Sequence, residues 1–251
     1  MVKNMLFTSA GDNTIFDSFW IDKHMNYDIF VFYYGVSKKN FEYYKSKVKF
    51  IERRKGSKFQ NFLFFYKKYP EIIKNYEYFF ILDDDIVLSV DDINFMFNTA
   101  KKYDLSICCP SHINNSKIYK SSNGPGKDIH KPGVLLTYTN FIEVCFPLLN
   151  KEALDKFIKY DGPKLVGFGI DYLYIWANGI DEKKKFAIIH AVQTINPGKC
   201  LKLLNRTREH KLIKGDNTER WMWKKHAQKI GCPIKFTIKE YESIMLNDSI
   251  K

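Results

Sequence analysis

The chain has 251 residues, of which 45% are hydrophobic and 16% aromatic, so it can bury a full core and lacks the composition of a disordered protein. Its formal net charge of +12 suits phosphate-bearing ligands or an anionic membrane surface, but no nucleic-acid-binding motif accompanies this charge, so we expect no nucleic-acid partner. The five cysteines have no CxxC spacing, which argues against a zinc site or a disulfide framework.

The first half of the chain alternates strands, loops and helices, which predicts an α/β domain with a mainly parallel sheet. The predicted strands are residues 5–9, 27–35, 48–52 and 78–82, and the predicted helices are residues 15–20, 59–69 and 93–103. No apolar run approaches the ~20 residues that cross a bilayer, and the N-terminus has the pattern of a strand rather than a signal peptide. We therefore expect a cytoplasmic protein, either free or at the periphery of an anionic membrane.

The second half continues the alternation around a long polar segment, residues 110–133, whose length is typical of a functional or mobile loop. Its predicted strands are residues 105–109, 134–139, 142–147 and 185–192. Its predicted helices are residues 151–159 behind an Asn150 cap, a helix that opens at Asp171, and residues 220–230 behind the capping-box pair Asp216 and Glu219.

Three consecutive acids, Asp83, Asp84 and Asp85, follow a Phe-Phe-Ile-Leu strand of the kind that is buried on both faces. Three carboxylates at a strand end repel one another, so a positive group should lie there, and a hard divalent cation that bridges phosphates is the natural candidate. The alternative is a cap for the next helix, but residues 91–92 fit that role better because the triplet comes too early in the chain. In open parallel sheets, ligands bind at the carboxyl ends of strands, which is where these acids lie.

Two segments together carry a resemblance to a known family. They are Phe80-Ile81-Leu82-Asp83-Asp84-Asp85-Ile86, which looks like a DxD motif, and Gly167-Phe168-Gly169-Ile170-Asp171, which looks like the element that begins an acceptor-side helix. With the strand at residues 187–192, they resemble the GT-A-type nucleotide-sugar glycosyltransferases, and in particular a little-characterised group found in bacteria, plants and large viruses. The resemblance covers about residues 1–200.

This resemblance implies a mixed, mainly parallel GT-A-like sheet flanked by helices. It divides the catalytic domain into a nucleotide-sugar half, about residues 1–105, and an acceptor half, about residues 106–200. Residues 201–251 would form a basic helical extension packed on that domain. Trp221 and Trp223 of this extension would pack in the core, stack on acceptor sugar or lie at a membrane interface. Its basic residues would fold over the diphosphate: Arg206, Arg208, Lys211 and Lys214.

The resemblance also implies a cofactor, Mn²⁺ or Mg²⁺, that acts as a Lewis acid on the leaving diphosphate. Asp85 would bind the metal directly, and Asp83 would reach the metal through a bound water or contact the ribose. Asp84 would border the same donor site, although its side chain in an extended strand points the other way. The third ligand that the group usually has is missing from its expected position, so His190 and Asn196 are candidates; for His190 a buried strand residue is the alternative.

Asp171 is the predicted general base, because an acceptor hydroxyl must lose a proton as it attacks the anomeric carbon. The alternative for Asp171 is a simple helix cap. Gly167 and Gly169 would let the backbone approach the sugar closely. A base at this place favours inversion at the anomeric carbon.

The remaining donor-site residues come from loops that follow the first and third strands. By analogy with the first-strand loop of the GT-A fold, Thr8, Ala10 and Asp12 would contact the nucleotide base or ribose. Lys55 and Lys58 would attract the diphosphate, with a solvated basic turn as the alternative.

The sequence thus predicts a metal-dependent glycosyltransferase that moves a sugar from a UDP- or GDP-sugar to a glycan or glycolipid acceptor. One alternative is a nucleotidyltransferase on the same acids, which would need further acids on a neighbouring strand. The other is a non-enzymatic basic protein that binds nucleic acid or anionic lipid.

Overall fold

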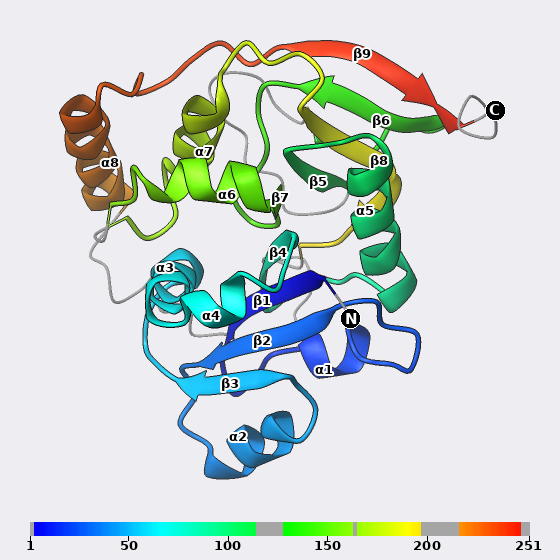
Figure 1. Ribbon diagram of the computed structural model, residues 1–251, viewed down its shortest axis with the longest axis vertical. Helices are drawn as coiled ribbons and strands as arrows, with labels where there is room; N and C mark the ends of the chain where they lie inside the picture. Colours follow the sequence, from blue (N-terminus) through cyan, green and yellow to red (C-terminus); the bar gives the residue numbers. More distant parts are fainter. Residues whose placement is uncertain (1–2, 114–127, 163–164, 197–215, 247–251) are drawn as a thin grey trace.

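The computed structural model describes residues 3–113, 128–162, 165–196 and 216–246, which together form a nine-stranded mixed sheet (Figure 1). Across this sheet the strands follow the order β3-β2-β1-β4-β7-β5-β8-β6-β9. Their bounds are β1 Asn4–Ala10, β2 Asp28–Tyr33, β3 Phe50–Arg53, β4 Tyr78–Asp83, β5 Ile107–His112, β6 Val134–Thr139, β7 Leu148–Asn150, β8 Phe186–Thr194 and β9 Glu240–Met245.

Strand direction places the candidate site at one edge of the sheet. The strands β1, β2, β3 and β4 are mutually parallel. The short β7 is antiparallel to both β4 and β5, so β5 runs parallel to β4, and β8 is parallel to β5. Only β7 and β6 run the other way within these ranges, and β9, which is antiparallel to β6, runs in the same direction as β8. The carboxyl ends of β1 to β5 and of β8 therefore share one edge, as predicted for a mainly parallel sheet.

The helices lie where the sequence periodicity predicts them, with two short additions. Their bounds are α1 Phe16–Phe19, α2 Lys38–Lys45, α3 Lys58–Lys68, α4 Pro70–Ile73, α5 Val90–Lys102, α6 Lys151–Ile158, α7 Ile170–Asn178 and α8 Asp216–Ile230. Capping boxes start α3 and α5, and Asn150 caps α6 through its side-chain oxygen, as predicted. Helix α5 begins earlier than predicted because Ser89 is its N-cap. None of the helices in the described ranges is long and apolar enough to cross a membrane.

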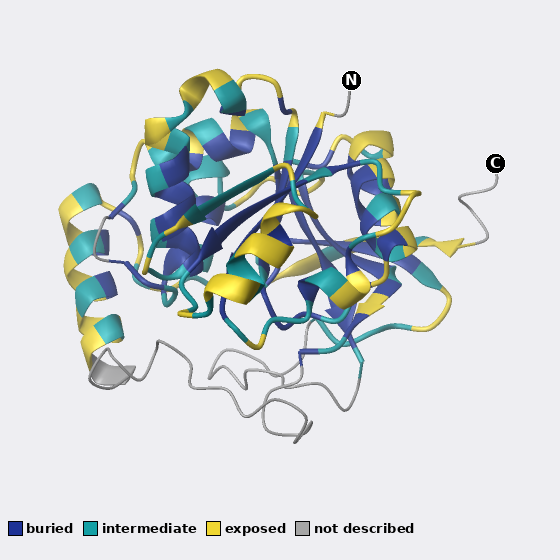
Figure 2. Ribbon diagram, turned by 90° about the horizontal axis from the view of Figure 1, so that it is seen from below, coloured by how far each residue is buried: buried dark blue, intermediate teal, exposed yellow. Residues whose placement is uncertain are grey.

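Strand β4 is buried on both faces because its successive side chains pack against different helices. The Phe79 ring lies edge-on to Phe62 of α3, with ring centroids 6.2 Å apart. The Phe80 ring lies edge-on to Phe97 of α5, with ring centroids 5.9 Å apart. Figure 2 shows the central strands in the colour of buried residues, with the exposed residues on the outer surface of the helices. The Phe-Phe-Ile-Leu run is thus the central buried strand that its composition predicts.

The predicted strand at residues 142–147 is wrong. This segment is a turn, and the strand β7 begins only at Leu148. The backbone N–H groups of Ile81 and Asp83 donate to the carbonyl oxygens of Pro147 and Cys145, at 2.9 and 3.1 Å. The segment therefore runs beside β4, and its Val144 and Cys145 carbonyl oxygens also accept hydrogen bonds from a lysine side chain.

The C-terminal part adds both a helix and a strand to the domain. Strand β9 pairs antiparallel with β6 and closes one edge of the sheet (Figure 1). Its side chains are mostly exposed and charged or polar, so its sequence has no alternating pattern that would predict a strand. Helix α8 begins at Asp216, four residues before the predicted start. A domain boundary near residue 200 stays a prediction, and the segment 197–215 with its four basic residues lies outside the described residues.

Helix α8 is held to the domain by Trp223. The indole is 1% exposed, and its Nε1 donates to the Ile234 carbonyl oxygen at 3.0 Å. Its ring stacks on Tyr172 of α7, with ring centroids 6.3 Å apart. Trp221 of the same helix is 56% exposed. Of the two tryptophans, Trp223 therefore takes the core role that the sequence left open.

We expect the Trp223→Ala substitution to lower the free energy of unfolding by about 3–5 kcal/mol, because it removes a buried aromatic ring and leaves a cavity. The matched control is Trp221→Ala, which should change that free energy by no more than about 0.5 kcal/mol because the side chain is exposed. Urea unfolding followed by intrinsic fluorescence would measure both. Equal effects of the two substitutions would contradict this packing.

Candidate active site

The acidic triplet lies at the carboxyl end of β4, in the turn that leads to α5. Asp83 is the last residue of the strand, and the Ile86 N–H donates to the Asp83 carbonyl oxygen at 3.2 Å. Asp84 and Asp85 are buried, at 7% and 3% exposed, whereas the Asp83 side chain is 36% exposed. The three carboxylates therefore have three different surroundings.

Asp84 joins the end of β4 to the loop after β1. Its Oδ2 accepts a hydrogen bond from the Gly11 N–H at 3.0 Å and another from the Tyr34 hydroxyl at 3.5 Å. The backbone of Asp84 also accepts from the Thr14 hydroxyl at 3.1 Å. Asp84 thus holds the loop after β1 in place through its side chain and its backbone.

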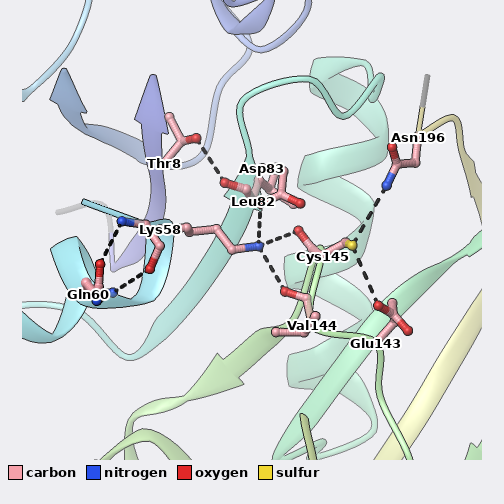
Figure 3. Close-up of polar contacts among 10 residues, drawn as sticks. Thr8, Lys58, Gln60, Leu82, Asp83, Glu143, Val144, Cys145 and Asn196 are labelled. Carbon is pink, nitrogen blue, oxygen red and sulfur yellow. Dashed lines mark hydrogen bonds and ion pairs between the residues drawn. The ribbon is translucent and has the colours of Figure 1, made fainter. Parts of the chain in front are cut away.

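Lys58 connects the triplet to the segment that precedes β7 (Figure 3). Its Nζ lies 3.1 Å from Asp83 Oδ1 and donates to the carbonyl oxygens of Val144 and Cys145, at 2.9 and 2.6 Å. The side chain is only 8% exposed. Lys58 is therefore neither the solvated turn residue nor the exposed phosphate-attracting cation that the sequence suggested; it is a buried link. Lys55 in the same turn is exposed.

The segment beside Lys58 carries a carboxylate that the sequence analysis did not select. Figure 3 shows the Cys145 thiol between Glu143 and Asn196: the thiol donates to Glu143 Oε1 at 3.6 Å and accepts from Asn196 Nδ2 at 3.8 Å. Strand β8 ends close by, because Val87 forms a bridge with Ile195. Glu143 thus lies beside the acidic end of β4 and the end of β8.

Asp171 lies in the first turn of α7, as predicted, and it interacts electrostatically with Glu143. Burial raises the pKa of Asp171 to about 7, although hydrogen bonds from nearby backbone N–H groups, including that of Tyr172, partly oppose the shift. Burial also raises the pKa of Glu143 to about 8, with a further contribution from the negative charge of Asp171. The pair therefore retains protons at a pH where exposed carboxyls have lost them.

Electrostatic contacts link the two sets of acids. Burial raises the pKa of the Cys145 thiol, and Glu143, Asp83 and Asp85 each add to this rise. Glu143 in turn interacts with Asp171. The structure thus brings Asp83, Asp85 and Asp171 around one short segment, residues 143–145.

Thr8, Ala10 and Asp12, which the sequence placed at the nucleotide, are buried or hydrogen-bonded within the protein. Thr8 and Ala10 are fully buried, and the Thr8 hydroxyl donates to the Leu82 carbonyl oxygen at 2.9 Å. The Asp12 carboxylate accepts from the Tyr33 hydroxyl and from the N–H groups of Val36 and Ser37, at 2.9 and 3.1 Å. Burial raises the pKa of Asp12, but these hydrogen bonds more than offset it and leave the pKa below its ordinary value. Asp12 thus orders the loop after β2.

The two glycines before Asp171 have different surroundings. A Cβ at Gly167 would meet nothing within 4 Å, so this backbone is open to a ligand. Gly169 has a φ of +90°, and a Cβ there would overlap the indole of Trp223. Gly169 is therefore required for a left-handed backbone and for packing under α8, and not by a close approach of sugar.

The hydrogen-bond partners of the His190 ring are Lys131 and Thr137, and not the acids at the end of β4. It is fully buried in β8; its Nδ1 accepts from the Lys131 N–H at 3.3 Å, and its Nε2 lies 3.1 Å from the Thr137 hydroxyl. Burial lowers the pKa of His190 to about 4, with nearby Lys131 and His130 adding to the shift. Among the described residues, no three His, Cys, Asp or Glu side chains gather as a metal cluster, so His190 does not join Asp83 and Asp85.

Two adjacent acids without a third protein ligand still fit one kind of metal site. Mg²⁺, and by the same chemistry Mn²⁺, is commonly held by one or two carboxylates together with substrate phosphates and waters, and not by a cage made only of protein. Asp85, buried at the carboxyl edge of the sheet, and the partly exposed Asp83 provide such hard oxygen donors. The donor set therefore fits a divalent cation that arrives with a diphosphate.

Solved glycosyltransferase structures resemble this chain in fold at very low sequence identity. S. aureus TarS 1–349 in complex with UDP-GlcNAc has a TM-score of 0.56 at 8% identity, with 91% of this chain and 66% of that chain covered. GalNAc-T7 with UDP, GalNAc and Mn²⁺ has a TM-score of 0.53 at 12% identity, with 77% of this chain and 43% of that chain covered.

The chain has the GT-A fold. It spans under two thirds of the length of either of these two chains. No protein-family model matches the sequence, and no curated protein matches it. The GT-A fold confirms the α/β class and the mixed sheet predicted from the sequence.

The raised pKa values of Asp171 and Glu143 predict how stability depends on pH. Each group binds its proton more tightly in the folded chain than in the unfolded chain, where the ordinary pKa is about 4. Their contribution to stability is complete below that pH and is lost as the pH rises through about 7 and 8. We expect the melting temperature to fall by several degrees between pH 5 and pH 8.5.

Asp171→Asn and Glu143→Gln should each flatten this dependence, because neither replacement titrates. The exposed Asp91→Asn is the matched control and should keep the wild-type slope. Differential scanning calorimetry across this pH range measures all four proteins. A wild-type slope in both site variants would show that neither carboxyl has the raised pKa.

Proposed function

We propose that this protein is a metal-dependent glycosyltransferase that moves a sugar from a nucleotide-diphosphate sugar to a hydroxyl group of a glycan or glycolipid. The observation that carries the proposal is the pairing, in a GT-A fold, of the β4-end acids with Asp171 across residues 143–145. A donor-binding acid pair and an acceptor-side carboxyl with a raised pKa are the two parts that sugar transfer to a hydroxyl requires.

The donor side is assigned to the carboxyl ends of β1 to β4. Asp85 would hold Mn²⁺ or Mg²⁺, and the partly exposed Asp83 would accept a hydrogen bond from a ribose hydroxyl. When bound, the metal supplies Lewis-acid stabilisation of the negative charge that develops on the leaving diphosphate. Lys55, which is exposed in the turn before α3, would add positive charge near the phosphates. Support for a nucleotide-sugar donor, and for a UDP-sugar before a GDP-sugar, comes from the two solved structures, which contain UDP or UDP-GlcNAc.

The acceptor side is assigned to Asp171. A pKa near 7 means that the carboxyl can be ionised at neutral pH and still accept a proton effectively from an attacking hydroxyl. Glu143, with its higher pKa, stays protonated beside it and adds no second negative charge. Apart from Gly167 and its two chain neighbours, no atom of the described residues lies within 4 Å of the place of a Cβ at Gly167, which supports an approach of the acceptor sugar to this turn. Attack by a hydroxyl that Asp171 deprotonates leads to inversion.

The exposed face of α8 supports an acceptor at an anionic surface, such as a glycolipid. Trp221 is 56% exposed, and the Lys225 Nζ lies 4.0 Å from the centroid of its ring. Lys224 is also exposed. An exposed indole next to lysines on a helix surface is the pattern of a helix that lies at a membrane interface.

The membrane assignment predicts binding to vesicles that contain phosphatidylserine and none to vesicles of phosphatidylcholine alone. Lys224→Glu with Lys225→Glu should weaken this binding by at least about thirtyfold, since each basic residue contributes about 1 kcal/mol at an anionic surface. Lys101→Glu with Lys102→Glu on α5 is the charge-matched control. Co-sedimentation measures the vesicle binding of the three proteins. If the wild type does not bind, a glycolipid acceptor at an anionic membrane is contradicted.

A thermal-shift screen of UDP- and GDP-sugars with and without Mn²⁺ tests the enzyme assignment directly. A donor at one hundred times its dissociation constant should stabilise the fold by about 2.7 kcal/mol, and only when Mn²⁺ is present. Asp85→Asn should abolish the Mn²⁺-dependent shift and donor hydrolysis, whereas Asp91→Asn should keep both. If a nucleoside triphosphate shifts the protein and no nucleotide sugar does, the nucleotidyltransferase alternative gains support.

Asp171→Asn separates donor binding from transfer. The variant should keep the Mn²⁺-dependent shift with the donor and should lose at least about a hundredfold in transfer rate, which is the usual contribution of a general base. Near-normal turnover in this variant would contradict the assignment of Asp171 as the general base, and with it the argument for inversion.

A further inference from the structure

The contacts of Lys58 account for all of its donors. An ammonium group has three protons, and Lys58 Nζ has three acceptors: Asp83 Oδ1 and the carbonyl oxygens of Val144 and Cys145. The residue is the first of α3, whose start is fixed by the Ser57 and Gln60 capping box, so its backbone position is well defined (Figure 3). Lys58 is thus a buried, fully hydrogen-bonded residue of the site and not a surface cation.

This arrangement changes the charge that the triplet presents to a cation. Asp83 is paired with a buried positive charge at 3.1 Å, and Asp84 is bonded to the Gly11 N–H at 3.0 Å. A lysine next to a carboxylate lowers the negative potential at that place, and the effect is large because the side chain is shielded from solvent. Asp83 and Asp85, with Lys58 paired to Asp83, therefore attract a divalent cation less than the same two acids would without the lysine.

We propose that Lys58 is a positioning residue that makes metal binding conditional on the nucleotide diphosphate. The Lys58–Asp83 pair holds Asp83 as a hydrogen-bond acceptor and leaves too little negative charge for Mn²⁺ to bind firmly alone. The diphosphate supplies the missing charge, so that metal and nucleotide bind together. This inference rests on the proposed function and adds the order and coupling of its two ligands.

Thermodynamic linkage makes the inference measurable. If UDP strengthens Mn²⁺ binding by some factor, Mn²⁺ strengthens UDP binding by the same factor. Removing the positive charge should raise the affinity for Mn²⁺ alone and should therefore reduce that factor. If the lysine only stabilised the fold, its replacement would not raise the affinity for Mn²⁺ alone while it lowers the factor by which UDP strengthens Mn²⁺ binding.

The test measures Mn²⁺ binding by electron paramagnetic resonance, first without nucleotide and then with saturating UDP or GDP. We expect Lys58→Gln, which keeps a hydrogen-bond donor and loses the charge, to bind Mn²⁺ alone about tenfold more tightly than the wild type. Lys58→Arg keeps the charge and should stay close to the wild type. Lys67→Gln is the matched control, because Lys67 lies on the same helix and pairs with Asp161, at 2.7 Å, but its side chain is 58% exposed.

A double substitution distinguishes charge balance from direct ligation by Asp83. Asp83→Asn alone leaves Lys58 unpaired and should weaken Mn²⁺ binding. Lys58→Gln with Asp83→Asn restores a neutral pair, so the affinity for Mn²⁺ alone should return to within about threefold of the wild type. If the double variant is as weak as Asp83→Asn, then Asp83 is a direct metal ligand and the inference is wrong.

The outcomes also separate this inference from the proposed function. If neither UDP nor GDP strengthens Mn²⁺ binding by the wild type, the proposed function fails and the inference fails with it. If a nucleotide strengthens Mn²⁺ binding but Lys58→Gln matches the wild type without nucleotide, only the inference fails. Thermal unfolding verifies that each variant folds, and Lys58→Met provides a second neutral variant if glutamine is not tolerated.

Discussion

The candidate site depends on the burial of β4 on both of its faces. Phe79 packs on α3 and Phe80 on α5, so the strand cannot slide or rotate without exposing large aromatic surface on one side. This packing fixes the acids at the strand end in position. It also explains why the positive partner of Asp83 comes from α3, whose side chains already cover the same strand.

The second constraint is the segment that runs beside β4 from the other half of the sheet. Its carbonyl oxygens accept hydrogen bonds from β4 backbone N–H groups and from Lys58, so the segment is attached to the donor half at several points. Glu143 belongs to this segment and interacts with Asp171. The acids at the end of β4 and Asp171 are therefore parts of one connected unit, and we expect a substitution at one to change the properties of the other.

Local patterns in the sequence were sufficient for most of the elements and for the two acidic positions. A buried strand followed by three acids, and a glycine turn followed by Asp171, are signals within ten residues of chain, and both lie where predicted. The burial of Lys58 and the packing of Trp223 on Gly169 depend on contacts between residues 50 to 90 positions apart, and the position of Glu143 near Asp171 depends on the fold as well, so a single sequence has no signal for them. Strand β9 was not predicted for another reason: an exposed edge strand has no buried face, so its sequence lacks the alternation of apolar and polar residues.

The contact between Gly169 and Trp223 limits how this protein can be divided. The ring of a C-terminal residue occupies the space that a side chain at position 169 would need, directly before Asp171. A chain shortened before α8 would leave an apolar hollow beneath the turn that carries the candidate base. The C-terminal helix is therefore not a modular appendage: in any exchange of this region between related proteins, the glycine and the tryptophan have to be transferred as a pair.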